Sequence, residues 1–139
     1  MIKKIIYFVI SIVIIAIVAG LYIWNKPHRN IASAKEDYSI SAEEFYKEYS
    51  ANEEAANKKY LNKIISVNGK ISEIQLENAN EPTLALKTTE DGITVSCGFD
   101  SKRLKDLKSL KTGDLVKIKG KCDGLGMFGI VITQCNLEK

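Results

Sequence analysis

Hydrophobic and polar positions divide the chain into an apolar run, a short polar stretch and two segments with different periods. The residues from Ile5 to Trp24 carry no charge, and a helix of this length spans roughly 30 Å, the thickness of a bilayer core. Lys3 and Lys4 precede the run and suit the headgroup region. We therefore predict one transmembrane helix at Ile5–Trp24, within an N-terminal membrane anchor of residues 1–24.

A cleaved signal peptide and a buried core helix are the alternatives to an anchor. The run is longer than the core of about 7–15 residues found in signal peptides, and the small-x-small site at residues 32–34 lies well past it. A core helix of a soluble protein would show a polar face, which this run lacks. The short head favours a cytoplasmic N-terminus. We therefore predict a single-pass protein of the bacterial cytoplasmic (inner) membrane, with its domain on the extracytoplasmic side.

The polar stretch at residues 25–40 has charged and small residues without a period, which is typical of a juxtamembrane linker. A helix is predicted to begin after Ser41, because Ser41 and Glu44 form a capping box and Ile40 can pack on Phe45. Apolar residues then recur at helical spacing, at Phe45, Tyr49, Ala56 and Tyr60. We expect this stripe to pack on the following domain; an aromatic ligand platform is the functional alternative.

After Asn62 the hydrophobic period changes to two, which indicates strands. The first strand changes parity near Ser72–Glu73, which implies a bulge. The predicted elements that follow are strands at 83–89 and 93–99, a short helix capped by Ser101, a strand around Val116 and Ile118, a glycine-rich stretch at 123–129 and a strand at 130–137. This order predicts a mostly β fold, a five-stranded OB-type barrel with a helix between strands three and four, over residues 41–139. A flat sheet with helices on one side is the alternative.

Several short motifs within residues 41–139 carry a resemblance to a known family. They are Ala56-Asn57-Lys58-Lys59-Tyr60, Val67-Asn68-Gly69-Lys70, Cys97-Gly98-Phe99, the run from Gly113 to Gly124, and Cys135. In this order they resemble the bacterial extracytoplasmic OB-fold proteins described as tRNA-anticodon-binding-domain-like, among which are lipoproteins and membrane-anchored proteins. The resemblance implies the fold and an envelope location, and it implies no molecular role. This chain has an apolar helix where the lipoprotein members have a lipid-bearing cysteine.

Charge is unevenly distributed between the two parts of the chain. Residues 1–40 hold five of the 20 Lys and Arg residues and two of the 17 Asp and Glu residues, so the domain itself is neutral. Barrels of this type bind oligonucleotides on strands two and three. The outward positions expected there, Thr94, Ser96 and Gly98, supply neither positive charge nor a ring for base stacking. Nucleic acid is therefore a disfavoured partner, and binding of single-stranded nucleic acid or oligonucleotides is the alternative function.

Catalytic and metal-binding constellations are hard to draw from this sequence. The only histidine, His28, lies in the linker, so no Ser/His or Cys/His arrangement can be built inside the domain. The three cysteines, Cys97, Cys122 and Cys135, lack the two-residue spacing of a zinc site. We therefore expect no enzyme activity, no metal and no cofactor, and the sequence leaves the oligomeric state open.

The best candidate binding surface is the glycine-rich loop, which carries Leu125, Met127 and Phe128. Apolar side chains at a loop tip are unfavourable in water unless a partner covers them. The alternative is that Leu125 and Phe128 fold back and plug the end of the barrel. The chain is thus predicted to be a binding module for a protein, peptide or glycan partner of the cell envelope.

Cys97 and Cys135 are the predicted disulfide pair. The last strand of an OB barrel closes in parallel on the third, which puts these two late positions at similar height. If the hairpin turn occupies residues 123–128, Cys135 lies near Val116 and roughly 20 Å from Cys122, beyond the reach of a disulfide. Cys122 is then expected to be a free thiol near the loop.

Overall fold

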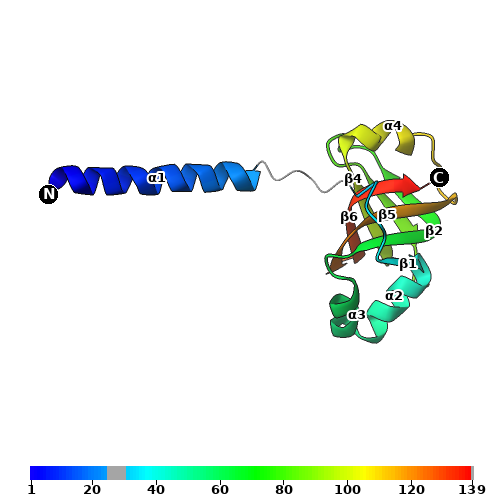
Figure 1. Ribbon diagram of the computed structural model, residues 1–139. Coiled ribbons are helices and arrows are strands. Elements are labelled where there is room, and N and C mark those ends of the chain that lie inside the picture. Colours follow the sequence, from blue (N-terminus) through cyan, green and yellow to red (C-terminus); the bar gives the residue numbers. More distant parts are fainter. Residues whose placement is uncertain (25–30, 139) are drawn as a thin grey trace.

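The computed structural model describes residues 1–24 and 31–138 (Figure 1). The first element, α1 (Ile2–Trp24), is a helix of 23 residues with none buried, and it is long and apolar enough to cross a membrane. A signal sequence near an N-terminus meets the same criterion. Residues 25–30 of the predicted linker, with His28, lie outside the described residues.

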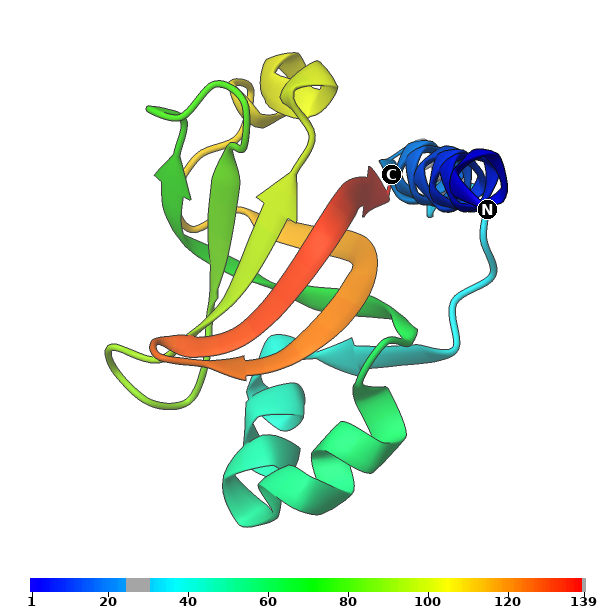
Figure 2. The same cartoon turned by 90° about the vertical axis from the view of Figure 1, so that its left-hand side faces the viewer.

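Five strands form a closed barrel, which confirms the predicted OB-type fold. They are β2 (Ile64–Gln75), β3 (Thr83–Lys87), β4 (Thr94–Phe99), β5 (Leu115–Gly126) and β6 (Gly129–Glu138). All neighbouring pairs are antiparallel except β4 and β6, which are parallel, and β2 closes the barrel on β5. A 3-10 turn, η1 (Ser101–Arg103), and α4 (Leu104–Leu107) connect β4 to β5 and lie at the top of the view in Figure 2. Asp100, rather than the predicted Ser101, caps this segment by accepting a 3.0 Å hydrogen bond from the Lys102 backbone N–H.

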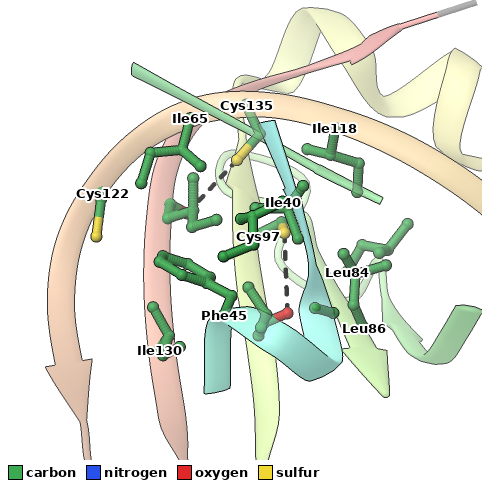
Figure 3. Close-up of a cluster of buried hydrophobic side chains, with 14 of the residues drawn as sticks. Ile40, Phe45, Ile65, Leu84, Leu86, Cys97, Ile118, Cys122, Ile130 and Cys135 are labelled. Carbon is green, nitrogen blue, oxygen red and sulfur yellow. Dashed lines mark hydrogen bonds between the residues drawn. The ribbon is translucent and has the colours of Figure 1, made fainter. Parts of the chain in front are cut away.

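The core follows the period-two pattern of the strands. Val95, Cys97 and Phe99 of β4 are buried, while the residues between them are half-exposed, so side chains alternate between the two faces as predicted. The predicted bulge in β2 is confirmed, because Ile71 pairs with Leu86 whereas Glu73 pairs with Ala85. Figure 3 shows the residues that fill the barrel: Ile65, Leu84, Leu86, Ile118 and Ile130, with Phe45 entering from the helix outside the barrel.

The predicted helix after Ser41 is two helices, α2 (Ala42–Ala51) and α3 (Glu53–Tyr60). Asn52 interrupts them with an extended backbone at φ −160°, and its side chain caps α3 by accepting a 3.0 Å hydrogen bond from the Ala55 backbone N–H. The predicted Ser41 cap is present, with a 3.2 Å hydrogen bond from the Glu44 N–H. The apolar stripe packs on the barrel as expected. Its rings are buried, so they offer no platform to a ligand; they are Phe45, Tyr49 and Tyr60.

The segment predicted as a linker is ordered against the barrel from Ile31 onward. Ile31 is buried, and β1 (Tyr38–Ser41) pairs in parallel with the start of β2. Asp37 joins this segment to Ile64 twice, because its N–H donates to the Ile64 carbonyl at 2.8 Å and its carboxylate accepts from the Ile64 N–H at 3.0 Å. A strand of four residues is too short to give a period in the sequence, which explains why it was missed.

Candidate functional site

The predicted binding loop is the tight turn of the β5–β6 hairpin. Gly126 pairs with Gly129, so only Met127 and Phe128 form the turn, and the predicted turn at residues 123–128 was too long. The Thr94 N–H donates a 3.1 Å hydrogen bond to the Phe128 carbonyl. Gly129 has φ +132°, and a Cβ there would collide with the Thr94 carbonyl, so only glycine fits this position. The turn is therefore fixed to the start of β4.

Three apolar side chains of this hairpin project into solvent. Met127 is 90% exposed, Phe128 is 75% exposed and Leu125 is 42% exposed. These residues do not fold back into the barrel, so the alternative in which Leu125 and Phe128 plug its end is wrong. We call Leu125, Met127 and Phe128 the hairpin tip. Full burial of one such side chain is favourable by about 1.5–3 kcal/mol. A partner that covers the hairpin tip can therefore gain binding free energy from each of the three side chains.

The barrel face next to the hairpin tip carries mostly small, uncharged side chains. Ala85, Ser96 and Val131 lie side by side across β3, β4 and β6, and all three are half-exposed. Lys87 is the one cation among the outward side chains that the structure describes on β3 and β4. Phe99 points into the core, as predicted. The described parts of β3, β4 and β6 therefore present no outward ring on which a base could stack, and the neighbouring exposed ring is Phe128 of the hairpin tip.

The base of the hairpin is held rigidly. Asp123 is a bulged residue between the pairs Cys122–Ile132 and Gly124–Val131, and its carboxylate accepts a 2.7 Å hydrogen bond from Thr133. Gly124 has φ +95° and lies against α3, where a Cβ would come within 3.2 Å of Asn57 and Leu61. The hairpin tip is thus presented by a supported hairpin.

The three cysteines are buried, and the structure has them as free thiols. The predicted hairpin register was wrong, because Cys122 lies opposite Ile132 rather than residue 129. Cys122 is not near the exposed turn, since it packs against α2, where its thiol lies 3.4 Å from the Tyr49 hydroxyl. Cys97 and Cys135 belong to the same buried cluster, and burial, followed by the neighbouring Cys97 thiol, raises the pKa of Cys135. The Cys97–Cys135 disulfide stays a prediction.

A second candidate site, which the sequence did not predict, is a pocket at the end of the barrel near α4. It is a pocket of about 760 Å³ open to solvent. Its lining includes Arg103, Asp106, Leu110, Leu115, Lys117 and Glu138. These residues come from η1, α4, the loop after it, β5 and β6. No local spacing connects them, so only the closed barrel brings them together.

Glu138 forms an ion-pair cluster at one side of this pocket. Its carboxylate accepts a 2.6 Å hydrogen bond from Ser66 and pairs with Lys117 at 3.0 Å and Lys119 at 3.2 Å. The Ser66 hydrogen bond and then the two ammonium groups outweigh partial burial and lower the pKa of Glu138 to about 2. Lys117 also lies 3.8 Å from Glu36, so the cluster connects the barrel to the segment before β1.

The closed five-stranded barrel behind an apolar N-terminal helix defines an OB-fold domain protein. The chain belongs to the tRNA_anti-like family, whose model matches residues 1–136. This finding agrees with the resemblance drawn from the sequence motifs. Among curated proteins, none matches the chain.

Three solved structures are compared with this chain. A lipoprotein from Klebsiella pneumoniae, described as a candidate nucleic acid-binding protein, superposes with a TM-score of 0.57 at 18% identity, covering 82% of this chain and 100% of that one. The asparaginyl-tRNA synthetase of Entamoeba histolytica gives a TM-score of 0.41 at 12% identity, covering 55% of this chain and 20% of that one. The Stn1–Ten1 complex of S. pombe gives 0.40 at 17% identity, covering 55% and 58%. At 18% identity, the likeness to the Klebsiella pneumoniae lipoprotein concerns the fold alone.

Proposed function

We propose that this chain is a membrane-anchored, extracytoplasmic binding module without catalytic activity, whose hairpin tip takes a protein or peptide partner of the cell envelope. The observation that carries the proposal is the exposure of Met127 and Phe128 on a hairpin fixed by Gly129 and Thr94. A rigid apolar projection of this kind is suited to a complementary apolar pocket on another protein.

The chemistry of the neighbouring face favours the same class of partner. Ala85, Ser96 and Val131 make a row of small, uncharged side chains, along which an extended peptide or a flat protein surface can lie. Glycan-binding sites typically use polar side chains and aromatic ring faces. The hairpin tip has one ring, Phe128, and no polar side chain. A protein or peptide is therefore placed before a glycan.

Nucleic acid is the second candidate, and the description of the Klebsiella pneumoniae neighbour is what favours it. Against it, single-stranded nucleic acid needs a basic groove with stacking rings. Lys87 is the one cation among the described outward side chains of β3 and β4, Phe99 points inward, and Phe128 at the hairpin tip is a single exposed ring, which falls short of such a groove.

The anchor and the location rest on the composition of α1 and on the family. An apolar helix that is fully exposed in the isolated chain requires an apolar surrounding, and a bilayer provides one. The short basic head before it favours a cytoplasmic N-terminus, which places the barrel outside the cytoplasm.

Site-specific photocrosslinking in cells that make the full chain tests the partner class. A benzophenone amino acid replaces Phe128 in one variant and Leu115, an equally exposed residue at the other end of the barrel, in the control. We expect one discrete protein adduct from position 128 and no protein adduct from position 115. Adding Leu125→Ser and Met127→Ser should abolish that adduct.

Three results would overturn the proposal. They are the absence of a protein adduct at position 128, the same adducts at positions 128 and 115, and an adduct that nuclease digests. As a separate check, the full chain in neutral detergent should not bind single-stranded oligonucleotides with an affinity that falls steeply with salt. Serine at the three positions of the hairpin tip should change the free energy of unfolding by no more than about 0.5 kcal/mol, because these side chains are exposed.

A further inference from the structure

The pocket beneath α4 combines an apolar wall with charges of both signs. The apolar wall consists of Leu110, Leu115 and Leu137. The side chain of Leu115 is 72% exposed to solvent, which is high for an apolar residue. The volume of about 760 Å³ lies within the range of sites for small organic ligands, roughly 300–1,000 Å³. Together these leucines give an apolar part of a ligand a surface to contact.

The charged groups of the pocket differ in how well they are paired. Lys117 and Glu138 already pair with each other at 3.0 Å, within the cluster that includes Ser66. Arg103 and Asp106 face each other at 3.7 Å, which is a loose contact between two side chains that are each about half-exposed. Arg103 and Asp106 are therefore the cation and the anion that a ligand can engage at little cost.

The pocket is also held near the membrane, if α1 is the anchor proposed above. Lys117 lies both in the pocket and 3.8 Å from Glu36, and the segment from Ile31 to Glu36 precedes β1 on the barrel surface. Seven peptide steps separate Trp24 from Ile31, and seven extended residues reach at most about 25 Å. The segment from Ile31 onward lies to the right in Figure 2, on the other side of the barrel from the β5–β6 turn. The pocket, and not the hairpin tip, thus adjoins the tether.

We propose that this pocket binds the headgroup of a phospholipid that carries both a phosphate and a primary ammonium, as phosphatidylethanolamine does. The phosphate pairs with the Arg103 guanidinium, whose planar set of donors suits phosphate oxygens. The ammonium pairs with the Asp106 carboxylate. Leu115 and Leu110 contact the glycerol and the first methylene groups. The inference rests on the proposed anchoring and is independent of what the hairpin tip binds.

The mixed charge of the pocket selects this headgroup over purely anionic ones. A headgroup with a phosphate but no ammonium leaves Asp106 without its partner and places a second anion beside it. A zwitterionic headgroup instead replaces the loose Arg103–Asp106 ion pair with two ion pairs, one to each side chain. It also displaces part of the water in the pocket.

Calorimetric titration of the full chain in neutral detergent tests the site. The probes are dihexanoyl phosphatidylethanolamine, dihexanoyl phosphatidylglycerol, glycerophosphoethanolamine and inorganic phosphate. We expect saturable binding of the first, weaker binding of the headgroup without acyl chains, and no measurable binding of the other two. Arg103→Gln should weaken binding by about tenfold or more, because a charge-assisted hydrogen bond is lost. Leu115→Ser should weaken it less.

Lys102→Gln is the matched control, since Lys102 lies on the same turn, is exposed and does not line the pocket. Its affinity should stay within about twofold of the parent chain. Equal losses from Lys102→Gln and Arg103→Gln would overturn the proposal and indicate general surface charge. Binding of inorganic phosphate or of phosphatidylglycerol as tight as that of phosphatidylethanolamine would also overturn it, as would no saturable binding at all. None of these results bears on crosslinking at position 128, so the two proposals fail separately.

Discussion

The Ser66 hydroxyl donates a 2.6 Å hydrogen bond to the Glu138 carboxylate, and this contact joins the first barrel strand to the last across 72 positions of sequence. Lys117 and Lys119 of β5 pair with the same carboxylate. The carboxylate is only about one-quarter exposed, so solvent screens these charges less than in a surface ion pair. The cluster therefore fixes the C-terminal end of β6 to β2 and β5 where the barrel closes.

Replacing Glu138 with Gln should destabilise the protein in a pH-dependent way. The folded-state pKa of Glu138 is about 2, below its unfolded value of roughly 4.3, so the ionised form stabilises the fold. This contribution is fully present above the unfolded pKa and is lost as the pH falls through about 2. We expect a loss of about 2 kcal/mol at pH 7, measured by urea unfolding, that shrinks toward zero near pH 2.

Glu54→Gln is the control for this measurement, because Glu54 pairs with Lys58 on an exposed helix face. It should change the free energy of unfolding by at most about 0.5 kcal/mol at either pH. A loss for Glu138→Gln that stays constant from pH 7 to pH 2.5 would show that the carboxylate acts through its shape rather than its charge.

Gly120 lies where β5 crosses the bulged part of β6, and it leaves no room for a side chain. A Cβ there would lie 2.5 Å from Ile132 Cγ2 and 2.8 Å from Cys135 Sγ. Gly120→Ala should therefore destabilise the barrel by about 1–3 kcal/mol, the usual effect of overpacking a core. Thermal unfolding followed by circular dichroism measures the loss.

Gly98→Ala on β4 is the matched control, because the nearest atom to a Cβ there is the Ile132 carbonyl oxygen at 3.8 Å. The free energy of unfolding of Gly98→Ala should lie within about 0.5 kcal/mol of that of the parent chain, and any small change should be stabilising. Equal losses from the two substitutions would mean that the space around Gly120 adapts more than the close contacts allow.

The fold was predictable because most of its strands alternate strictly. Val95, Cys97 and Phe99 are buried as their period requires, and the parity change near Ser72 marks a real bulge. The break between α2 and α3 at Asn52 has a weaker signal in the sequence. An asparagine followed by two glutamates is typical of a helix N-cap, but it also occurs inside a longer helix, so the pattern alone does not predict a break.

The hairpin register could not be obtained from the pattern of apolar residues. Two shifts set it, one at Asp123 and one between Thr133 and Asn136, where Gln134 has φ +54°. The second shift brings both Ile132 and Cys135 into the core, although residues three apart in a regular strand face opposite sides. The pocket beneath α4 was equally hidden, because its charged residues come from separate elements that meet only when the barrel closes.

The cysteine pair gives a third prediction. Cys135 lies opposite Phe99, two residues beyond Cys97, which corresponds to a Cα separation of about 8 Å from strand spacing and rise. A disulfide tolerates about 6.8 Å, so the bridge requires the strands to approach by about 1 Å. Because the two cysteines lie on neighbouring strands within one buried cluster, we expect oxidised protein to yield a Cys97–Cys135 crosslinked peptide on mapping after alkylation.

Cys122 serves as the internal control in that experiment. It is buried against Tyr49, and burial raises its pKa, so it should resist alkylation in the folded protein and react once the chain is unfolded. Three alkylated cysteines from unfolded, unreduced protein would refute the bridge. A Cys122–Cys135 peptide would contradict the register of the hairpin itself.

Asn52 provides the last prediction, because one side chain separates two helices and caps the second. Its backbone N–H donates to the Glu48 carbonyl at 3.2 Å, and its side chain accepts from the Ala55 N–H at 3.0 Å. This break places the Tyr60 ring 5.0 Å from the Phe45 ring, edge to face. Asn52→Ala should lower the free energy of unfolding by about 1 kcal/mol, since an orphan helix N–H loses its acceptor and alanine favours one continuous helix.

Asn52→Ser keeps an acceptor at the same position and should recover most of that stability, to within a few tenths of a kcal/mol of the parent chain. Urea unfolding at constant pH compares the three proteins, and near-ultraviolet circular dichroism reports the packing of the Tyr60 and Phe45 rings. If serine destabilises as much as alanine, the side-chain cap is not what holds the break. The contacts of the rings with the barrel would then set the angle between α2 and α3, with Asn52 only following them.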